Sequence, residues 1–279
     1  GSALEMFLNN ELDWIDSIPS EFIDRVSKMP EFRKSPFLGT YFYRLNVKSN
    51  TPLTNRKVRK ALYLSVNRDY ICKYIGKAGQ IPSYGFVPVN MPNYKGFEGE
   101  KENYDLARKL MMEAGFTNGK NFPVLTILYN TLEDHKKIAE FIQQVWKNEL
   151  GINVVLENQE WKVYLQKVQA GDYQIARAGW IGDYIDPNTF LDMFVTDGGN
   201  NQTGWSNPKY DELIRKAKYE KNNNKRMRLF YEAEKILIDE CPIIPIYTYV
   251  RLFAIKNYVK GVYPNILDLH PLKKVYIEK

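Results

Sequence analysis

Cysteine and histidine are scarce in this chain of 279 residues, and their scarcity removes several kinds of chemistry. The two cysteines, Cys72 and Cys241, allow at most one disulfide, and each stands among apolar neighbours, where a buried free thiol is favoured. Neither cysteine has a partner at metal-ligand spacing, and two histidines are too few for a multi-histidine metal site. We therefore expect neither a metal nor any other cofactor.

Long apolar runs and the common catalytic motifs are absent as well. No stretch of about 18 apolar residues occurs, so no segment is predicted to span a membrane. The chain lacks Gly-x-Ser-x-Gly, His-Glu-x-x-His, Cys-x-x-Cys and Gly-x-Gly-x-x-Gly. We therefore do not expect an enzyme.

The excess of basic residues is small and dispersed. Lysine and arginine number 39 against 33 acidic residues. Bases and acids alternate along helix-like segments, as in Lys216, Lys218, Glu220 and Lys221, which is typical of a solvated face. We therefore expect no nucleic-acid partner.

The sequence does contain a periodicity that predicts alternating strands and helices. Strands are predicted at 124–129, 152–156 and 173–178, with helices at 134–149 and 160–169. Such a βαβαβ unit forms a parallel sheet, and ligands of open parallel sheets lie beyond the carboxyl ends of the strands. We predict an α/β fold, with the runs Asn130–His135 and Arg177–Asp183 at the ligand-binding edge.

Weaker patterns define the flanking elements. Two short helices are predicted in 1–35 and an extended run at 41–46. Proline and glycine predict a loop at 79–92, and the two prolines of 242–253 predict an edge strand or a crossing between lobes. Further helices are expected at 55–65, 67–76, 105–114, 208–219 and 225–240, and short extended pieces at 261–263 and 274–277.

The run from Arg177 to Asp186 is the best candidate for a binding site. A guanidinium can hold a carboxylate through two parallel hydrogen bonds, and the free carboxylate of Asp183 prefers an ammonium. These opposite charges suit a ligand that carries both signs. An internal ion pair between Arg177 and Asp183, beside a core Trp180, is the alternative.

Two further alternatives stay open at this point. The acidic pairs Glu133/Asp134 and Asp183/Asp186 allow a carboxylate-based hydrolase, although adjacent acids in loops usually cap helices or face solvent. Trp161 and Trp180 flank predicted strand ends, where each can face a ligand or pack between lobes.

Several blocks of sequence resemble one known family. They are Pro52-Leu53-x-Asn55-x-x-Val58-Arg59-x-Ala61-Leu62, Ala107-x-x-Leu110-Met111-x-Glu113-Ala114-Gly115-Phe116, Asn207-Pro208-x-Tyr210-Asp211-x-Leu213, Glu234-x-Ile236-Leu237 with Pro242-x-x-Pro245-Ile246-Tyr247, and Arg177-Ala178-Gly179-Trp180. Together they resemble the peptide-binding proteins of oligopeptide ABC importers, which are extracellular solute-binding proteins of family 5. The resemblance covers nearly the whole chain.

The resemblance implies a fold like that of type II periplasmic binding proteins, in which two lobes close on a ligand. This chain resembles only the C-terminal half, and its Gly1-Ser2 start without methionine fits a piece of something longer. The resemblance implies one complete lobe at 46–248, flanked by a remnant of the first lobe with a hinge strand at 1–45 and by a return hinge with a second remnant at 249–279.

The resemblance also implies a function. The family binds short oligopeptides outside the cell and delivers them to the membrane subunits of an ABC importer. Such a protein is either a lipoprotein on the outer face of the cell membrane or a protein of the periplasm. The composition of the chain favours a Gram-positive bacterium and therefore the lipoprotein. A peptide-pheromone signalling receptor of the same fold is the alternative.

Particular residues take roles from the resemblance. Asp183 would pair with the α-ammonium of a peptide, and Arg177, His135 and Lys167 would offer cations near its carboxylate. Trp161, Trp180 and Tyr249 would line side-chain pockets or the hinge. These roles agree with physical expectation, because a site that accepts many peptides must hold the backbone and the termini, which all peptides share.

Lobe closure excludes water and strengthens such charge pairs, so we expect this chain alone to bind peptides much more weakly. We also expect the helix at 5–15 and the run Tyr41–Tyr43 to lack their packing partners, which makes self-association a possible property of the chain.

Overall fold

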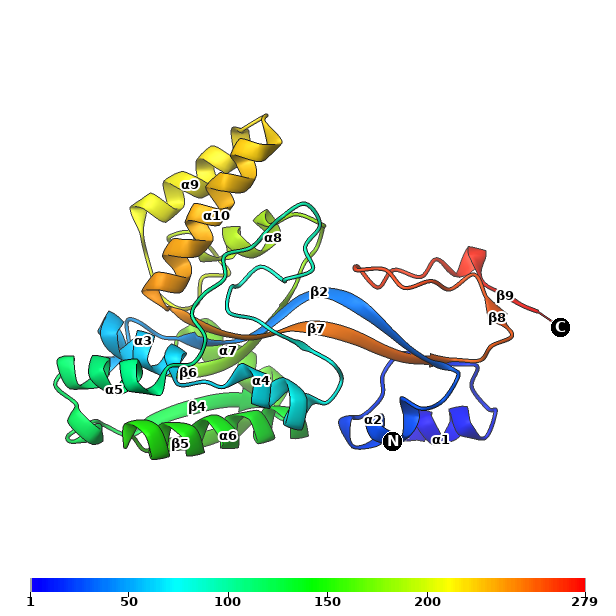
Figure 1. The fold of residues 1–279 in the computed structure, drawn as a ribbon, viewed down its shortest axis with the longest axis horizontal. Helices are drawn as coiled ribbons and strands as arrows, with labels where there is room; N and C mark the ends of the chain where they lie inside the picture. Colours follow the sequence, from blue (N-terminus) through cyan, green and yellow to red (C-terminus); the bar gives the residue numbers. More distant parts are fainter. Residues whose placement is uncertain (1, 279) are drawn as a thin grey trace.

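The computed structural model describes residues 2–278 and confirms the predicted α/β core (Figure 1). Its three parallel strands are β4 (Leu125–Asn130), β5 (Val154–Gln159) and β6 (Ile175–Ile181), connected by helices α6 (Glu133–Leu150) and α7 (Trp161–Ala170). The order β5-β4-β6 arises because both crossovers return to the same sheet. The predicted βαβαβ unit is therefore present.

Helix α6 shows how the apolar pattern produces this core. Ile138, Ile142 and Trp146 recur every four residues and are each 1% exposed, so one stripe of the helix is buried against the sheet. Gly151 ends the helix with φ of 70°, the left-handed conformation that glycine adopts without steric cost.

Asparagine begins five of the other helices. In α3 (Arg56–Leu64), α4 (Arg68–Tyr70), α5 (Tyr104–Glu113), α9 (Pro208–Tyr219) and α10 (Asn223–Glu240), the preceding asparagine accepts a hydrogen bond from a backbone N–H of the first turn. Each such cap stabilises its helix by about 1 kcal/mol. The helices predicted around these positions are therefore confirmed.

Two long antiparallel strands connect the two ends of the molecule. β2 (Phe32–Leu45) pairs with β7 (Ile243–Ile255) from Phe32↔Ala254 to Arg44↔Ile243. The sheet order is β1-β7-β2-β6-β4-β5, so β7 is an interior strand, and of the two alternatives predicted for 242–253 the edge strand is wrong. The sheet tolerates Pro245 because its pair with Phe42 lies at a bulge in the register.

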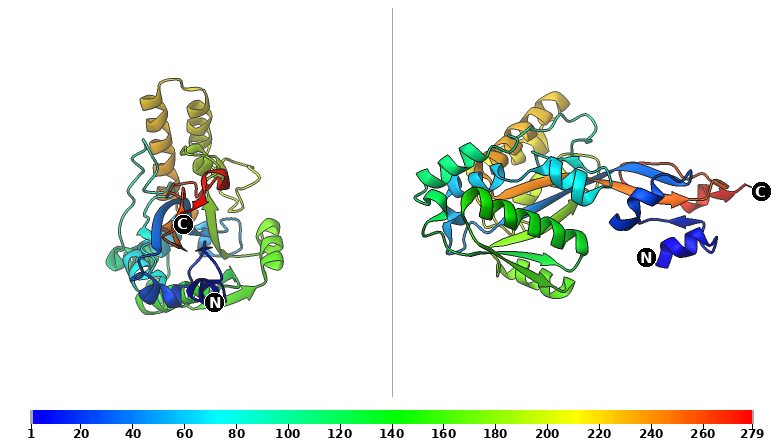
Figure 2. Two further views of the ribbon diagram at one scale, coloured as in Figure 1. Left: turned by 90° about the vertical axis from the view of Figure 1, so that its right-hand side faces the viewer. Right: turned by 60° about the horizontal axis from the view of Figure 1, so that its bottom comes forward.

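A small second core lies at the far end of these strands, where both termini are found (Figure 2). It contains α1 (Ser2–Leu8), β1 (Trp14–Ile15) and α2 (Ile23–Val26). Its buried members are Leu4, Phe7, Ile15, Ile18, Ile23, Val26, Leu252 and Ala254.

The packing here corrects two expectations. The helix predicted at 5–15 ends at Leu8, and its apolar residues are buried in this second core. The predicted unpartnered run is also buried, since Tyr41 is 0% and Tyr43 1% exposed. The four most exposed large apolar side chains of this end lie instead in the C-terminal segment, at Leu269, Leu272, Tyr276 and Ile277.

The remaining elements are short. They are α4 (Arg68–Tyr70), a π-helical turn at Ile71–Gly76, β3 (Ile81–Pro82) inside the predicted loop, α8 (Asn188–Leu191), β8 (Val259–Lys260) and β9 (Tyr276–Ile277), with 3-10 turns at Ser20–Phe22, Pro52–Thr54, Thr117–Gly119, Asp192–Phe194 and Leu272–Lys274. Both cysteines are buried and free. Among residues 2–278, no helix combines the length and apolarity needed to cross a bilayer.

Candidate functional site

Strand β6 carries the central residues of the candidate site. It continues to Ile181, beyond the predicted end at residue 178, because β2 pairs with it as far as Gly39↔Ile181. Arg177 therefore lies within the strand rather than at its carboxyl end. The pairing with β4, in contrast, stops at Leu128↔Ala176.

Arg177 is held by polar and aromatic partners that carry no negative charge. Its Nη2 donates to Tyr249 Oη at 2.9 Å and its Nη1 to Asn130 Oδ1 at 3.4 Å. The guanidinium carbon lies 4.6 Å from the centre of the Tyr41 ring, a favourable cation–π position. Its buried Nε has no hydrogen-bond partner among residues 2–278.

The alternative of an internal ion pair at Arg177 is wrong. Within residues 2–278, no carboxylate oxygen lies within 4.0 Å of its guanidinium, and Asp183 has no cationic partner either. A permanently charged guanidinium that is largely desolvated and has a free N–H is poised to receive an anion.

His135 lies beside Arg177 at the start of α6. Its ring is 6% exposed, and its Nδ1 is 3.4 Å from Tyr41 Oη. Burial, reinforced by the charge of Arg177, lowers the pKa of His135 to about 3. The imidazole is therefore neutral at physiological pH, which corrects the expectation that His135 supplies a cation.

A cavity of about 290 Å³ joins these groups to the second core. Arg177, His135 and Tyr249 line it together with Tyr247 and residues of the N-terminal segment, including Asp16 and Ser20. Ser20 Oγ donates to Asp134 Oδ1 at 2.7 Å and so connects that segment to the start of α6. Three of the predicted site residues are thus brought together.

The backbone edge of β6 beyond Arg177 is free on the side of β4. Gly182 N donates to Leu38 O of β2 at 2.8 Å, so by the alternation of an antiparallel ladder Trp180 and Ala178 also face β2. The N–H and C=O groups of Gly179 and Ile181 then face away from β2, where no strand of the described part of the chain pairs with them.

Gly179 allows the close packing at this edge. A Cβ atom there would lie 2.7 Å from Tyr249 Oη and 3.3 Å from Arg177 Nη2. Any larger residue would therefore displace the hydrogen bond between those two side chains.

Asp183 follows β6 and is exposed. Thr189 fixes its backbone, since Asp183 N–H donates to Thr189 Oγ1 at 3.2 Å. Trp180 Nε1–H donates to Thr189 O at 2.6 Å, and its ring packs against the main core. Trp180 therefore supports the position of Asp183 from the face of β6 opposite to Arg177.

The neighbouring acids of Asp183 differ from it. Asp186 receives two hydrogen bonds from Arg226, at 2.5 and 2.8 Å, and is neutralised by that ion pair. Burial raises the pKa of Asp192, and the charge of Asp183 adds to this effect. Because Asp186 is paired with Arg226, Asp183 and Asp186 are not two free carboxyl groups.

Trp161 and Lys167, both on α7, have different surroundings. The Trp161 ring is half exposed and stacks on Tyr164 at 5.6 Å, and Tyr164 Oη donates to the carbonyl of Arg177. Lys167 binds Glu157 at 2.6 Å and Asp172 at 3.5 Å. It lines a separate cavity of about 730 Å³ that contains neither Arg177 nor Tyr249, so the structure does not bring Lys167 to the other predicted residues.

Sequence reasoning missed several members of the site. Tyr41, Tyr164, Gly179 and Thr189 each touch or position a predicted residue. Tyr41 stands in a strongly aromatic run and Gly179 in the block Arg177–Trp180, but neither pattern by itself assigns the residue to the site. Within residues 2–278, no group of three or more potential metal ligands occurs.

Comparison with known proteins connects this geometry to a family. Residues 1–202 match the family described as bacterial extracellular solute-binding proteins, family 5 Middle. The chain is 38% identical over 276 residues to the oligopeptide-binding protein OppA of Bacillus subtilis, covering 94% of this chain and 50% of that protein. The chain thus spans about half the length of the curated relatives it matches.

Solved structures agree with this relationship. A periplasmic oligopeptide-binding protein of Borrelia burgdorferi superposes with a TM-score of 0.90 at 36% identity, covering 99% of this chain and 56% of that one. OppA of Haemophilus influenzae in complex with the peptide RPPGFSPFR gives 0.88 at 34% identity, covering 100% and 56%. The predicted fold class is therefore confirmed, and the chain belongs to family 5 of the bacterial extracellular solute-binding proteins.

Proposed function

We propose that this chain forms one wall of a site that binds short oligopeptides outside the cell. One observation carries the proposal: Arg177 and Asp183, neither of them ion-paired within residues 2–278, lie at the two ends of a backbone edge of β6 that no strand of those residues covers. A free peptide carries the complementary charges at its two ends. Its backbone has the donors and acceptors that such an edge requires.

The charges also assign a direction to the peptide. With its ammonium at Asp183 and its carboxylate at Arg177, an extended peptide runs antiparallel to β6. Arg177 and Asp183 are six positions apart in the sequence, a distance of about 20 Å along a strand. Allowing for the reach of the Arg177 side chain, about three to five extended peptide residues fit.

The remaining site residues take roles that do not depend on peptide sequence. His135, as a neutral group, accepts or donates a hydrogen bond near the carboxylate. Trp161 and Tyr249 offer flat apolar surfaces to peptide side chains, and Trp180 positions the Asp183 end. We assign Lys167 no direct contact, because both of its carboxylate partners are intramolecular.

The whole protein would deliver peptides to the membrane subunits of an ABC importer. It would sit as a lipoprotein on the outer face of the membrane or lie in the periplasm. We further propose that 46–248 is one lobe, and that 1–45 and 249–279 belong to a hinge and to a second lobe completed by sequence outside this chain. The exposed apolar residues of the C-terminal segment, such as Leu272 at 70%, would then be covered by that lobe or by self-association.

A titration monitored by NMR tests the proposal on this chain. Trialanine with free ends, its N-acetylated form, its C-amidated form and the doubly blocked form are added up to millimolar concentration. We expect the free peptide to bind with a dissociation constant weaker than micromolar, because only one wall is present, and double blocking to weaken binding at least about tenfold. Equal binding of all four forms would contradict the proposal.

A mixture of peptides separates a transporter from a signalling receptor. A pool of tri- to pentapeptides should bind the chain broadly, because recognition uses the termini and the backbone. Retention of a single sequence from the pool would favour the pheromone-receptor alternative.

A further inference from the structure

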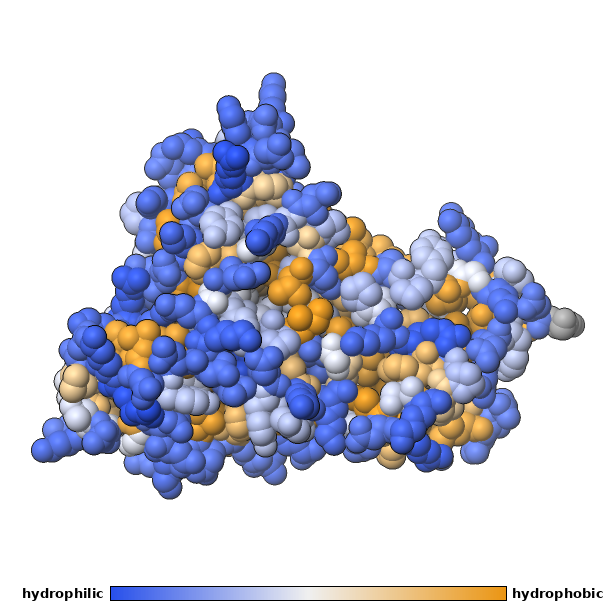
Figure 3. Space-filling view, in the orientation of Figure 1, coloured by the Kyte–Doolittle hydropathy of each residue, from blue (hydrophilic) through white to orange (hydrophobic). Residues whose placement is uncertain are grey.

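The tip of the α9–α10 hairpin, together with the parts of both helices next to it, concentrates positive charge. Residues 207–228 contain eight lysines and arginines and three acids, which gives +5 against +6 for all 279 residues. The hairpin projects from the main body, away from the long strands β2 and β7 (Figure 1). In the space-filling view its tip forms a continuous hydrophilic surface (Figure 3).

Most of these cations form no ion pair within the described residues. Lys216 pairs with Glu212 and Arg226 with Asp186, but the five other cations between residues 215 and 228, all exposed, have no carboxylate within 4.0 Å among residues 2–278. These five are Arg215, Lys218, Lys221, Lys225 and Arg228.

The free cations lie in two stripes. On α9, Arg215, Lys218 and Tyr219 follow helical spacing, and all three line one surface cavity, which shows that they share a face. On α10 and the turn before it, Lys221, Lys225 and Arg228 recur at four and three residues. Both stripes meet at the tip, and Tyr219 there is 71% exposed, the largest exposed fraction of any large hydrophobic side chain described.

The tip is held rigidly by the residues beneath it. Arg226 Nε donates to Ala217 O at 3.1 Å across the hairpin, while its other nitrogens bind Asp186. Asn222 caps α10 by accepting from Lys225 N at 3.1 Å. A fixed, convex display of positive charge around an exposed aromatic ring is suited to a flat anionic surface rather than to a groove that follows a nucleic acid.

We propose that the tip of the α9–α10 hairpin docks the protein on an anionic lipid membrane. Arg215, Lys218, Lys221, Lys225 and Arg228 attract the headgroups, and Tyr219 enters the interfacial layer, where its ring and hydroxyl are both accommodated. Such docking would keep the receptor near its importer. Membrane docking is compatible with the proposed location outside a membrane. Its test requires no peptide, so the docking proposal and the peptide-binding proposal can each fail without the other.

Co-sedimentation with vesicles tests the docking on the 279-residue chain. Vesicles of phosphatidylcholine with 30% phosphatidylglycerol are compared with pure phosphatidylcholine at low salt. The variant Lys218→Gln, Lys221→Gln, Lys225→Gln and Arg228→Gln should partition onto anionic vesicles at least about tenfold less than the parent chain. Binding of the parent should also decrease steeply between 50 and 500 mM NaCl.

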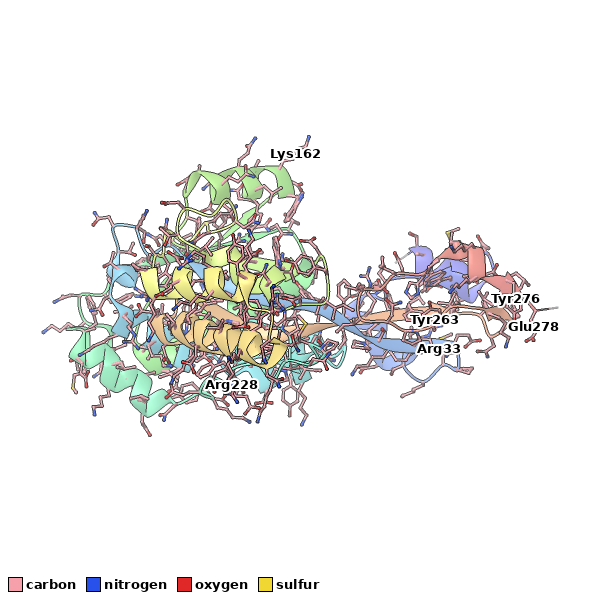
Figure 4. All side chains as sticks on the ribbon, turned by 90° about the horizontal axis from the view of Figure 1, so that it is seen from above. Arg33, Lys162, Arg228, Tyr263, Tyr276 and Glu278 are labelled. Atoms are coloured by element: carbon pink, nitrogen blue, oxygen red, sulfur yellow. The ribbon has the colours of Figure 1, made fainter. Side chains whose placement is uncertain are left out.

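A matched control removes the same charge elsewhere. Lys28, Lys109, Lys147 and Lys162 are exposed and have no ion-pair partner among the described residues; Lys162 and Arg228 lie on opposite sides of the molecule (Figure 4). Their quadruple glutamine variant should bind within about twofold of the parent chain. Tyr219→Ser should weaken partitioning about threefold with little change in salt dependence.

Three results would overturn the proposal. They are equal binding to neutral vesicles, equal losses in both quadruple variants, and binding of a 20-base-pair DNA duplex that matches vesicle binding and is lost in the same hairpin variant. Thermal unfolding of each variant verifies its fold. If the hairpin variant unfolds, the pair Lys221→Gln and Lys225→Gln should still lower partitioning about threefold.

Discussion

The two ends of the β6 edge are built differently. Arg177 is surrounded by Tyr41, Tyr249 and the neutral His135 and is largely removed from water. Asp183 is exposed, and only its backbone is fixed, through Thr189. One pole of the candidate site is therefore preorganised inside the protein, while the other remains solvated.

This difference has an energetic consequence. The desolvation cost of the buried Arg177 guanidinium is offset in part by its neutral partners, and a ligand carboxylate would offset it further. An exposed carboxylate gains little from an ammonium until water is excluded. We therefore expect the carboxylate end of a peptide to dominate binding to this chain, and the amino end to matter more when a second lobe covers it.

Replacing the buried cation should have the largest effect. Arg177→Met should lower the affinity for free-ended trialanine at least about thirtyfold, because the carboxylate would lose its charged partner. It should leave the free energy of unfolding unchanged or raise it by about 1 kcal/mol, since an unpaired buried charge is removed. NMR titration and urea unfolding measure the two quantities.

Arg226→Met is the matched control, because Arg226 is a cation that already has its counter-ion, Asp186. This variant should lose stability and keep its peptide affinity. If Arg177→Met instead destabilised the fold by several kcal/mol without changing affinity, Arg177 would be structural.

Removing the exposed acid should have a smaller and more selective effect. Asp183→Asn preserves the shape of the side chain, so the loss should come from charge alone. We expect about a fivefold weaker affinity for trialanine and less than a twofold change for N-acetyl-trialanine. A similar loss for both peptides would show that Asp183 does not pair with the ammonium.

The neutral histidine predicts a specific dependence of stability on pH. Because the pKa of His135 is lowered to about 3 in the folded state, the unfolded chain binds an additional proton between about pH 6.5 and pH 3. Stability is then lost as the pH decreases through this window, by about 3 kcal/mol at pH 4.5 relative to pH 7.5. In His135→Gln this part of the difference should disappear from urea unfolding curves. If the difference in stability between pH 7.5 and pH 4.5 were unchanged in His135→Gln, a group other than His135 would be responsible for it.

Lys167 should have the smallest effect of the predicted cations. Lys167→Met removes ion pairs with Glu157 and Asp172, whose side chains are partly solvated, so stability should decrease by no more than about 1 kcal/mol. Peptide affinity should change less than twofold. A tenfold loss would mean that the cavity of Lys167 belongs to the peptide site after all.

Local patterns predicted the fold well, because its causes are local. The apolar stripe of α6, its glycine stop and the asparagine caps are all visible within a few residues of sequence. The register of β2 with β7 and the interior position of β7 could not be predicted locally, because they depend on pairing between segments about 200 residues apart. For the same reason the continuation of β6 to Ile181 could not be predicted.

The candidate site likewise combines residues that the local sequence indicates with residues that it does not. Arg177 and Asp183 stand in one short run, so the local sequence indicates both charges directly. Thr189, Tyr164 and the neutral state of His135 depend on packing between elements, and no spacing indicates them. Lys167 was assigned through the family resemblance, but Glu157 and Asp172, on neighbouring turns and strands, already neutralise it.

The free edge of β6 is the central claim, and amide hydrogen exchange tests it most directly. With millimolar trialanine present, the amide protons of Gly179 and Ile181 should exchange at least about tenfold more slowly, whereas that of Trp180, which faces β2, should not change. Unchanged exchange at Gly179 and Ile181, while the peptide is shown to bind, would contradict the account.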